Sequence, residues 1–151
     1  MKKRVVGNVA TAAAIASLAV IGTSGEAHAD GHVKWQNAKT GMCLQETGEG
    51  VRTGNCNNEF ATWYEKNLFG SVYRIKLTNG SEYCLDSNKS GSVYVLPCKK
   101  DNPNQMWAES KTSTGWRLTN YATNRVLDSN WAGSAYTNFD EGDSNRFQRW
   151  K

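Results

Sequence analysis

The chain contains three copies of one sequence pattern, and this repetition constrains its fold more than any other feature. The second and third copies contain the matching segments Asn79 to Asp86 (N-G-S-E-Y-C-L-D) and Asn120 to Asp128 (N-Y-A-T-N-R-V-L-D), each preceded by Leu-Thr. An earlier relative runs from Asn37 to Gln45 (N-A-K-T-G-M-C-L-Q). In repeat architectures one unit cannot bury its apolar face alone. We therefore expect the three copies to share a single core.

Each copy carries one leucine and ends on one tryptophan at matching positions: Leu44, Leu85 and Leu127, and Trp63, Trp107 and Trp150. The leucines lie 41 and 42 residues apart and the tryptophans 44 and 43. Large aromatic side chains supply much of the apolar area in a small domain. We predict that these six residues lie in the core.

The local patterns indicate strands and turns. Residues 72–77 alternate and are rich in β-branched and aromatic residues, and residues 92–97 form a similar run. Gly follows Asn79 and Ser90, as is typical of turns. A copy of about 42 residues accommodates about four short strands. Four strands in each of three copies predict an all-β domain of twelve strands. A β-propeller is not expected, because three blades are too few to close a ring.

The N-terminal segment has the three parts of a secretory signal peptide. Basic residues occupy positions 2–4, an apolar stretch covers about 9–21, and A-H-A stands at 27–29. The apolar stretch is shorter than the roughly 20 residues of a membrane-spanning helix. We predict that residues 1–29 are cleaved, that residues 30–151 form one domain, and that the protein is secreted without membrane insertion.

The charge of the remaining 122 residues argues against nucleic acid as a partner. Without residues 1–29 the chain has 15 Lys+Arg and 13 Asp+Glu, a net charge of +2, and Lys99-Lys100 is its only adjacent basic pair. We expect the protein to be a monomer on its own.

Four cysteines remain after cleavage: Cys43, Cys56, Cys84 and Cys98. An even number in an exported chain predicts disulfides, and four cysteines allow three connectivities. The spacing favours Cys43–Cys56 and Cys84–Cys98, which close two loops of nearly equal length. A zinc site is not expected, because close C-x-x-C pairs and nearby histidines are absent from the sequence. We expect no metal and no cofactor.

The combination of C-L-D, a cysteine about 14 residues later and Q-x-W, in tandem copies, resembles the ricin B-chain type β-trefoil lectins over about residues 33–151. The resemblance implies a single β-trefoil with repeats at about 33–67, 72–108 and 115–151, one shallow sugar pocket per repeat, and the same two intra-repeat disulfides. Val126 stands where the other copies have Cys43 and Cys84, so the third copy should lack a bridge.

The resemblance also implies what a working pocket contains. The Asp of C-L-D binds sugar hydroxyls, an aromatic residue two positions before the second cysteine stacks on the ring, and an Asn after that cysteine and the Gln of Q-x-W complete the set. An aromatic plane suits the apolar face of a sugar, and a carboxylate and an amide suit its vicinal hydroxyls. In the first copy, Gln45 and Gly54 replace the Asp and the aromatic residue.

The second copy keeps Asp86 and Gln105, but Leu96 stands at the aromatic position, with Tyr94 nearby, and Lys99 replaces the Asn. We retain Asp86, Tyr94 and Gln105 as a weaker candidate site. Alternatively, Asp86 only organises a turn by accepting backbone N–H bonds, and this role is favoured for it.

The third copy offers the best candidate site. It keeps Asp128 and Gln148, and counting back from Gln148 places Phe139 at the aromatic position and Gly142 at that of the Asn. Asn145 or Asp143 would substitute for the missing amide. For Asp128, the ligand role and the turn role both stay open, and the glutamines too could serve the fold.

The sequence predicts a recognition protein that is not an enzyme. The only histidine after cleavage, His32, lies near the new N-terminus, where a catalytic base is poorly held. Since no pocket is complete, the sequence favours a protein-binding adaptor in a secreted assembly, such as an antibacterial toxin complex. Trp131 and Tyr136 would contact the secreted partner, unless they only pack in the hairpin cap. The alternative is a lectin that binds a surface glycan or polysaccharide through the third pocket.

Overall fold

The computed structural model describes residues 29–151, so the signal peptide predicted for residues 1–29 lies, apart from Ala29, outside the described residues. Eleven strands and three 3-10 helices follow one another: β1 (Gly31–Val33), β2 (Cys43–Glu46), β3 (Val51–Gly54), η1 (Glu59–Ala61), β4 (Trp63–Phe69), β5 (Val72–Leu77), β6 (Tyr83–Ser87), β7 (Val93–Pro97), η2 (Pro103–Gln105), β8 (Trp107–Thr112), β9 (Gly115–Asn120), β10 (Val126–Ser129), β11 (Ala135–Asn138) and η3 (Arg146–Gln148). This part of the chain contains no α-helix, and hence none long and apolar enough to cross a membrane.

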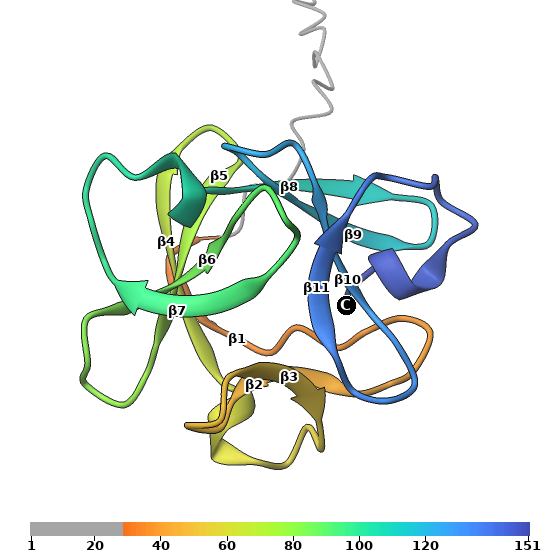
Figure 1. Ribbon diagram of the computed structural model, residues 1–151, viewed down its shortest axis with the longest axis horizontal. Helices are drawn as coiled ribbons and strands as arrows, with labels where there is room; N and C mark the ends of the chain where they lie inside the picture. Colours follow the sequence, from red (N-terminus) through yellow and green to blue (C-terminus); the bar gives the residue numbers. More distant parts are fainter. Residues whose placement is uncertain (1–28) are drawn as a thin grey trace, which may run out of the picture.

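The strands form the predicted β-trefoil. Figure 1 shows three hairpins, β2–β3, β6–β7 and β10–β11, arranged around a common centre. The remaining strands pair with one another in the order β1-β4-β5-β8-β9. The structure has eleven strands where twelve were predicted, because the last one is reduced to single bridges from Trp150 to Asn37 and Trp116.

The predicted core is confirmed, and one hydrogen bond recurs in it three times. The three leucines and three tryptophans that mark the copies are all fully buried. Each indole N–H donates to the carbonyl oxygen of its own copy's leucine, over 2.9 Å (Trp63 to Leu44), 3.0 Å (Trp107 to Leu85) and 3.1 Å (Trp150 to Leu127). Trp35, Ile75 and Leu118, from the first strand region of each copy, complete the cluster.

Both predicted disulfides are present. Cys43–Cys56 and Cys84–Cys98 join Cα atoms 4.9 and 5.1 Å apart. In the third copy the buried Val126 takes the place of the first cysteine, so that copy has no bridge. The disulfides thus fasten the segment after β3 and β7 to the strand that begins each hairpin.

Two buried glutamates lie together in the barrel. Glu65 on β4 and Glu109 on β8 each follow their copy's tryptophan by two residues and are 2% and 4% exposed. The Trp35 indole N–H donates to Glu65 Oε1 at 2.7 Å. Burial, followed by the charge of Glu65, raises the pKa of Glu109 from 4.5 to about 9. Near neutral pH the pair therefore keeps a proton.

This pair predicts a pH dependence of stability. Between about pH 4.5 and 9 the folded protein holds a proton that the unfolded chain releases, so the free energy of unfolding should fall as the pH rises through this window, by at most about 1.4 kcal/mol per pH unit. Glu109→Gln should remove most of this slope, as measured by urea unfolding at about pH 5, 7 and 9. The exposed Glu82→Gln is the matched control, and equal slopes in both variants would contradict the assignment.

Candidate functional site

The second and third copies hold one carboxylate each at the same place beside the core. Asp86 on β6 and Asp128 on β10 directly follow the leucines whose carbonyls the tryptophans bind. Neighbouring residues in a strand point to opposite faces. The leucine enters the core, and the aspartate therefore points to the other face, where it is 2% exposed (Asp86) or 4% exposed (Asp128).

A tyrosine lies directly across the hairpin from each aspartate. Asp86 pairs with Tyr94, and Asp128 pairs with Tyr136. Burial and the aspartate charge raise the pKa of both tyrosines. The structure thus brings together the predicted Asp86 and Tyr94, and it places Tyr136, which was expected to contact a protein partner, beside Asp128 instead.

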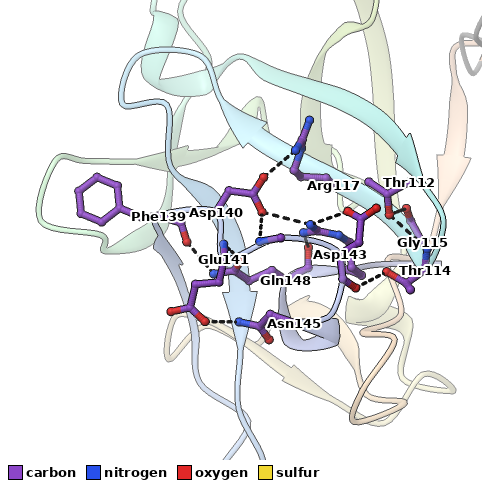
Figure 2. Close-up of polar contacts among 12 residues, drawn as sticks. Thr112, Thr114, Gly115, Arg117, Phe139, Asp140, Glu141, Asp143, Asn145 and Gln148 are labelled. Atoms are coloured by element: carbon purple, nitrogen blue, oxygen red, sulfur yellow. Dashed lines mark hydrogen bonds and ion pairs between the residues drawn. The ribbon is translucent and has the colours of Figure 1, made fainter.

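The register corrects the alignment that placed Phe139 opposite Asp128. Leu96 pairs with Cys84 and Asn138 with Val126, so Asn138 is the counterpart of Leu96. The third copy has one residue more between this position and its glutamine, which shifts the count from Gln148 by one. Phe139 is 68% exposed, its ring stacks 4.5 Å from the Arg125 guanidinium, and Figure 2 shows it pointing away from Gln148.

Each glutamine of Q-x-W closes the loop after its hairpin. Gln105 Oε1 accepts the backbone N–H of Lys99 at 2.8 Å, and its Nε2 donates to the Pro97 carbonyl at 3.1 Å. Gln148 makes the same two contacts, with Glu141 N and Phe139 O, both at 2.9 Å (Figure 2). The glutamines therefore hold the wall of the pocket.

Gln148 also binds Asp128, the carboxylate of the third copy. Its Nε2 donates to Asp128 Oδ2 at 3.0 Å, and the backbone N–H of Ser129 donates to Oδ1 at 2.7 Å. Burial raises the pKa of Asp128, and these two donors hold it down in part. The turn role considered for Asp128 is thus present. A carboxylate has about four lone-pair sites, so acceptor capacity remains.

Asp86 is surrounded by more protein donors. Asn102 Nδ2 lies 3.3 Å from its Oδ2. Burial raises its pKa, against hydrogen bonds from Gln105, Tyr94 and Asn102. In the third copy the Tyr136 hydroxyl instead donates to the Ser129 carbonyl at 3.3 Å. Asp128 therefore keeps more of its capacity to accept a hydrogen bond from a ligand than Asp86 does.

Asn145 begins a 3-10 helix. Its Oδ1 accepts the Phe147 backbone N–H at 3.1 Å, as Asn102 accepts that of Asn104 in the second copy, and its Nδ2 donates to Glu141 Oε2 at 2.7 Å. The side chain of Asn145 therefore binds within its own loop, and Figure 2 shows its contact with Glu141.

Beneath this loop lies a group of ionic contacts. The fully buried Arg149 donates to Asp140 at 3.1 Å and to Asp143 at 3.0 Å, and Arg117 binds Asp140 at 2.6 Å (Figure 2). Hydrogen bonds that include those from Arg149 lower the pKa of both aspartates, although partial burial opposes them. Asp143, the other substitute considered for the amide, thus serves the loop.

The pocket of the first copy is filled by its own side chain. Gln45 is 6% exposed and lies across Gly54, where a Cβ atom would come within 2.1 Å of Gln45 Nε2. Arg52, not an aromatic residue, pairs with Gln45 across the hairpin. No space remains there for a ring stacked against the amide.

Trp131 is 65% exposed and contacts Phe147 edge to face, with ring centroids 6.0 Å apart.

Among residues 29–151, no three His, Cys, Asp or Glu side chains are grouped so as to hold a metal ion. The place of Tyr136 opposite Asp128 was not predicted from the sequence. The signal was available, since Tyr94 and Tyr136 both follow their aspartates by eight residues.

Comparison with known proteins identifies this architecture. A family model described as "Ricin-type beta-trefoil lectin domain" matches residues 31–150. Among curated proteins, none matches the sequence. Solved structures do match. The designed three-fold symmetric protein ThreeFoil has a TM-score of 0.66 and 18% identity, over 81% of this chain and 97% of that one.

Two natural proteins resemble the chain to a similar degree. SeviL bound to asialo-GM1 saccharide has a TM-score of 0.64 and 19% identity, over 80% of this chain and 94% of SeviL. A GlcNAcα1-4Gal-releasing endo-β-galactosidase from Clostridium perfringens has a TM-score of 0.71 and 16% identity, over 80% of this chain. The chain spans only 31% of that enzyme.

The glutamine contacts predict that Gln148→Ala destabilises the protein. The variant leaves the Glu141 N–H and Asp128 Oδ2 without their partner, which should lower the free energy of unfolding by about 1–3 kcal/mol. Gln36→Ala, which removes an exposed bond to the Gly41 carbonyl, should cost less than about 0.5 kcal/mol. Urea unfolding measures both variants, and equal losses would show that the Gln148 contacts stabilise the protein no more than an exposed hydrogen bond does.

Proposed function

The chain belongs to the ricin-type beta-trefoil lectin domain family, and on this basis we propose that it is a secreted lectin that binds a carbohydrate through its third pocket. The family, with the saccharide-bound SeviL among its structural relatives, supports a non-catalytic binding module with a carbohydrate-binding fold. Two disulfides are consistent with an extracellular protein.

One observation carries the choice of pocket: Asp128 lies opposite Tyr136 and is bound by Gln148, while the Tyr136 hydroxyl is turned to Ser129. Asp128 can then accept a sugar hydroxyl, and Tyr136 can offer its half-buried ring to an apolar sugar face. In the second pocket, Asn102 and Tyr94 already bind the carboxylate of Asp86. The first pocket is filled by Gln45.

The protein-adaptor hypothesis that the sequence favoured is replaced by its alternative. It rested on the departures of all three pockets from the family pattern. Once the register places Tyr136 beside Asp128, the third copy has a carboxylate, an aromatic ring and an amide together. Of the two residues assigned to protein contact, only Trp131 is largely exposed.

The proposal predicts that glycan binding depends on Tyr136 and Asp128. On an array of extracellular polysaccharides and oligosaccharides, the protein should bind a defined set, and Tyr136→Ala and Asp128→Asn should weaken that binding by about tenfold or more. The matched control is Tyr121→Ala, since Tyr121 is exposed and packs on Phe69.

Circular dichroism and thermal unfolding of each variant separate loss of binding from loss of fold. Binding that survives Tyr136→Ala and Asp128→Asn in folded protein would place the site elsewhere. Absence of any glycan binding, with a secreted protein captured instead, would overturn the lectin proposal.

A further inference from the structure

The junction between the first and second copies lacks a contact that closes the other two junctions. At two junctions, an asparagine at or shortly after the end of the first strand of a copy reaches the end of the neighbouring copy. Asn37 Nδ2 donates to the Phe147 carbonyl at 2.7 Å, and Asn120 Nδ2 donates to the Asn104 carbonyl at 2.8 Å. Asn37 and Asn120 are 1% and 0% exposed. We call this the asparagine contact.

The corresponding Asn79 does not make this contact. It is exposed, and its Oδ1 accepts the backbone N–H and the hydroxyl of Ser81 at 3.0 and 2.6 Å. The counterpart of the Phe147 and Asn104 carbonyls would be that of Phe60, with which Asn79 has no hydrogen bond within residues 29–151.

The length of the turn explains the difference. Asn37 and Asn120 precede Cys43 and Val126 by six residues, and Asn79 precedes the equivalent Cys84 by five. The two longer turns close with N–H bonds of 2.9 Å from Gly41 to the Asn37 carbonyl and from Asn124 to the Asn120 carbonyl. Gly41 and Asn124 there adopt positive φ, 73° and 57°. The shorter turn does not form this bond.

A hollow of about 140 Å³ lies at this junction. It lies between the segment around η1 and the end of β5, and its lining includes Glu46, Glu59, Phe60, Thr62, Leu77 and Asn79. Thr78, also in the lining, donates its hydroxyl to the Thr62 carbonyl at 3.1 Å. The missing asparagine contact therefore coincides with an open space between two copies.

The lining combines an aromatic ring with negative charge. Phe60 is 46% exposed and Leu77 is half-buried, so the hollow has an apolar wall. Within residues 29–151, no Lys or Arg nitrogen lies within 4.0 Å of the carboxylates of Glu46 and Glu59. Glu46 Oε1 accepts the backbone N–H of Gly48 at 2.8 Å, and neither carboxylate has a cationic partner among these residues. An aromatic face beside such carboxylates attracts a cation that carries an apolar body.

We propose that this hollow binds a sugar that carries a free amine, such as a glucosamine unit of a deacetylated polysaccharide. The carboxylates of Glu46 and Glu59 would face the ammonium group, Phe60 the apolar face of the ring, and Thr62 and Asn79 its hydroxyls. A lysine side chain would use the charges but not these polar groups. The inference rests on the proposed lectin function and adds a second, charge-selective site between the first and second copies.

The test compares two probes, a glucosamine hexamer and its fully N-acetylated counterpart, by calorimetry at low salt and mildly acidic pH. The free-amine hexamer should bind about tenfold more tightly or better, and added salt should weaken it. Phe60→Ala and Glu59→Gln should each reduce its affinity about tenfold. The matched controls Phe69→Ala and Glu49→Gln, both exposed residues outside the hollow, should leave it unchanged.

A second variant tests the cause of the hollow. Lengthening the turn after Asn79 by one residue should restore the asparagine contact to Phe60, close the hollow and abolish binding of the amine, with every lining residue intact. Equal affinity for both hexamers, no binding of either, or tighter binding of a lysine peptide would overturn the proposal. Tyr136→Ala keeps the two sites distinguishable. If Tyr136→Ala loses binding of the free-amine hexamer while Phe60→Ala and Glu59→Gln keep it, the amine binds in the third pocket. If Tyr136→Ala loses neutral glycans but still binds the free-amine hexamer, the amine binds in the hollow.

Discussion

The hydrogen bond from the tryptophan indole to the leucine carbonyl, repeated in every copy, fixes the geometry on which the rest of the molecule depends. It joins the end of one hairpin loop to the strand that begins the hairpin, inside a core where no water competes. Because the bonded leucine is followed by Asp86 or Asp128, the same bond sets the carboxylate at the edge of the core. Fold and candidate site are therefore parts of one arrangement.

On this common arrangement, the copies differ by single side chains and single residues of loop length. Gln45 fills the first pocket, donors from its own copy occupy Asp86 in the second, and Asp128 in the third has Tyr136 opposite with its hydroxyl turned aside. The turn after Asn79 is shorter by one residue, and the hollow beside Phe60 lies at the same junction. Threefold symmetry thus gives stability, whereas departures from it give each copy its own surface.

The repeat, the disulfides and the core were predictable because each depends on residues whose spacing the chain preserves. The register of the third hairpin was not, since Val126 removes the cysteine that would have marked it, and one extra loop residue moved the count from Asn138 to Phe139. The proximity of Glu65 and Glu109 could not be predicted, because the two residues lie 44 positions apart in the sequence and meet only in the folded barrel. The choice of adaptor over lectin rested on the departures of all three pockets from the family pattern.

Whether the third pocket binds a sugar can be measured by a nuclear magnetic resonance titration of the isotopically labelled protein with a glycan that it retains. The Ser129 and Glu141 amides and the Gln148 side-chain amide should shift first, since they bind or border the Asp128 carboxylate. Shifts that leave these three groups unmoved, and gather instead around Asp86 or Trp131, would contradict it.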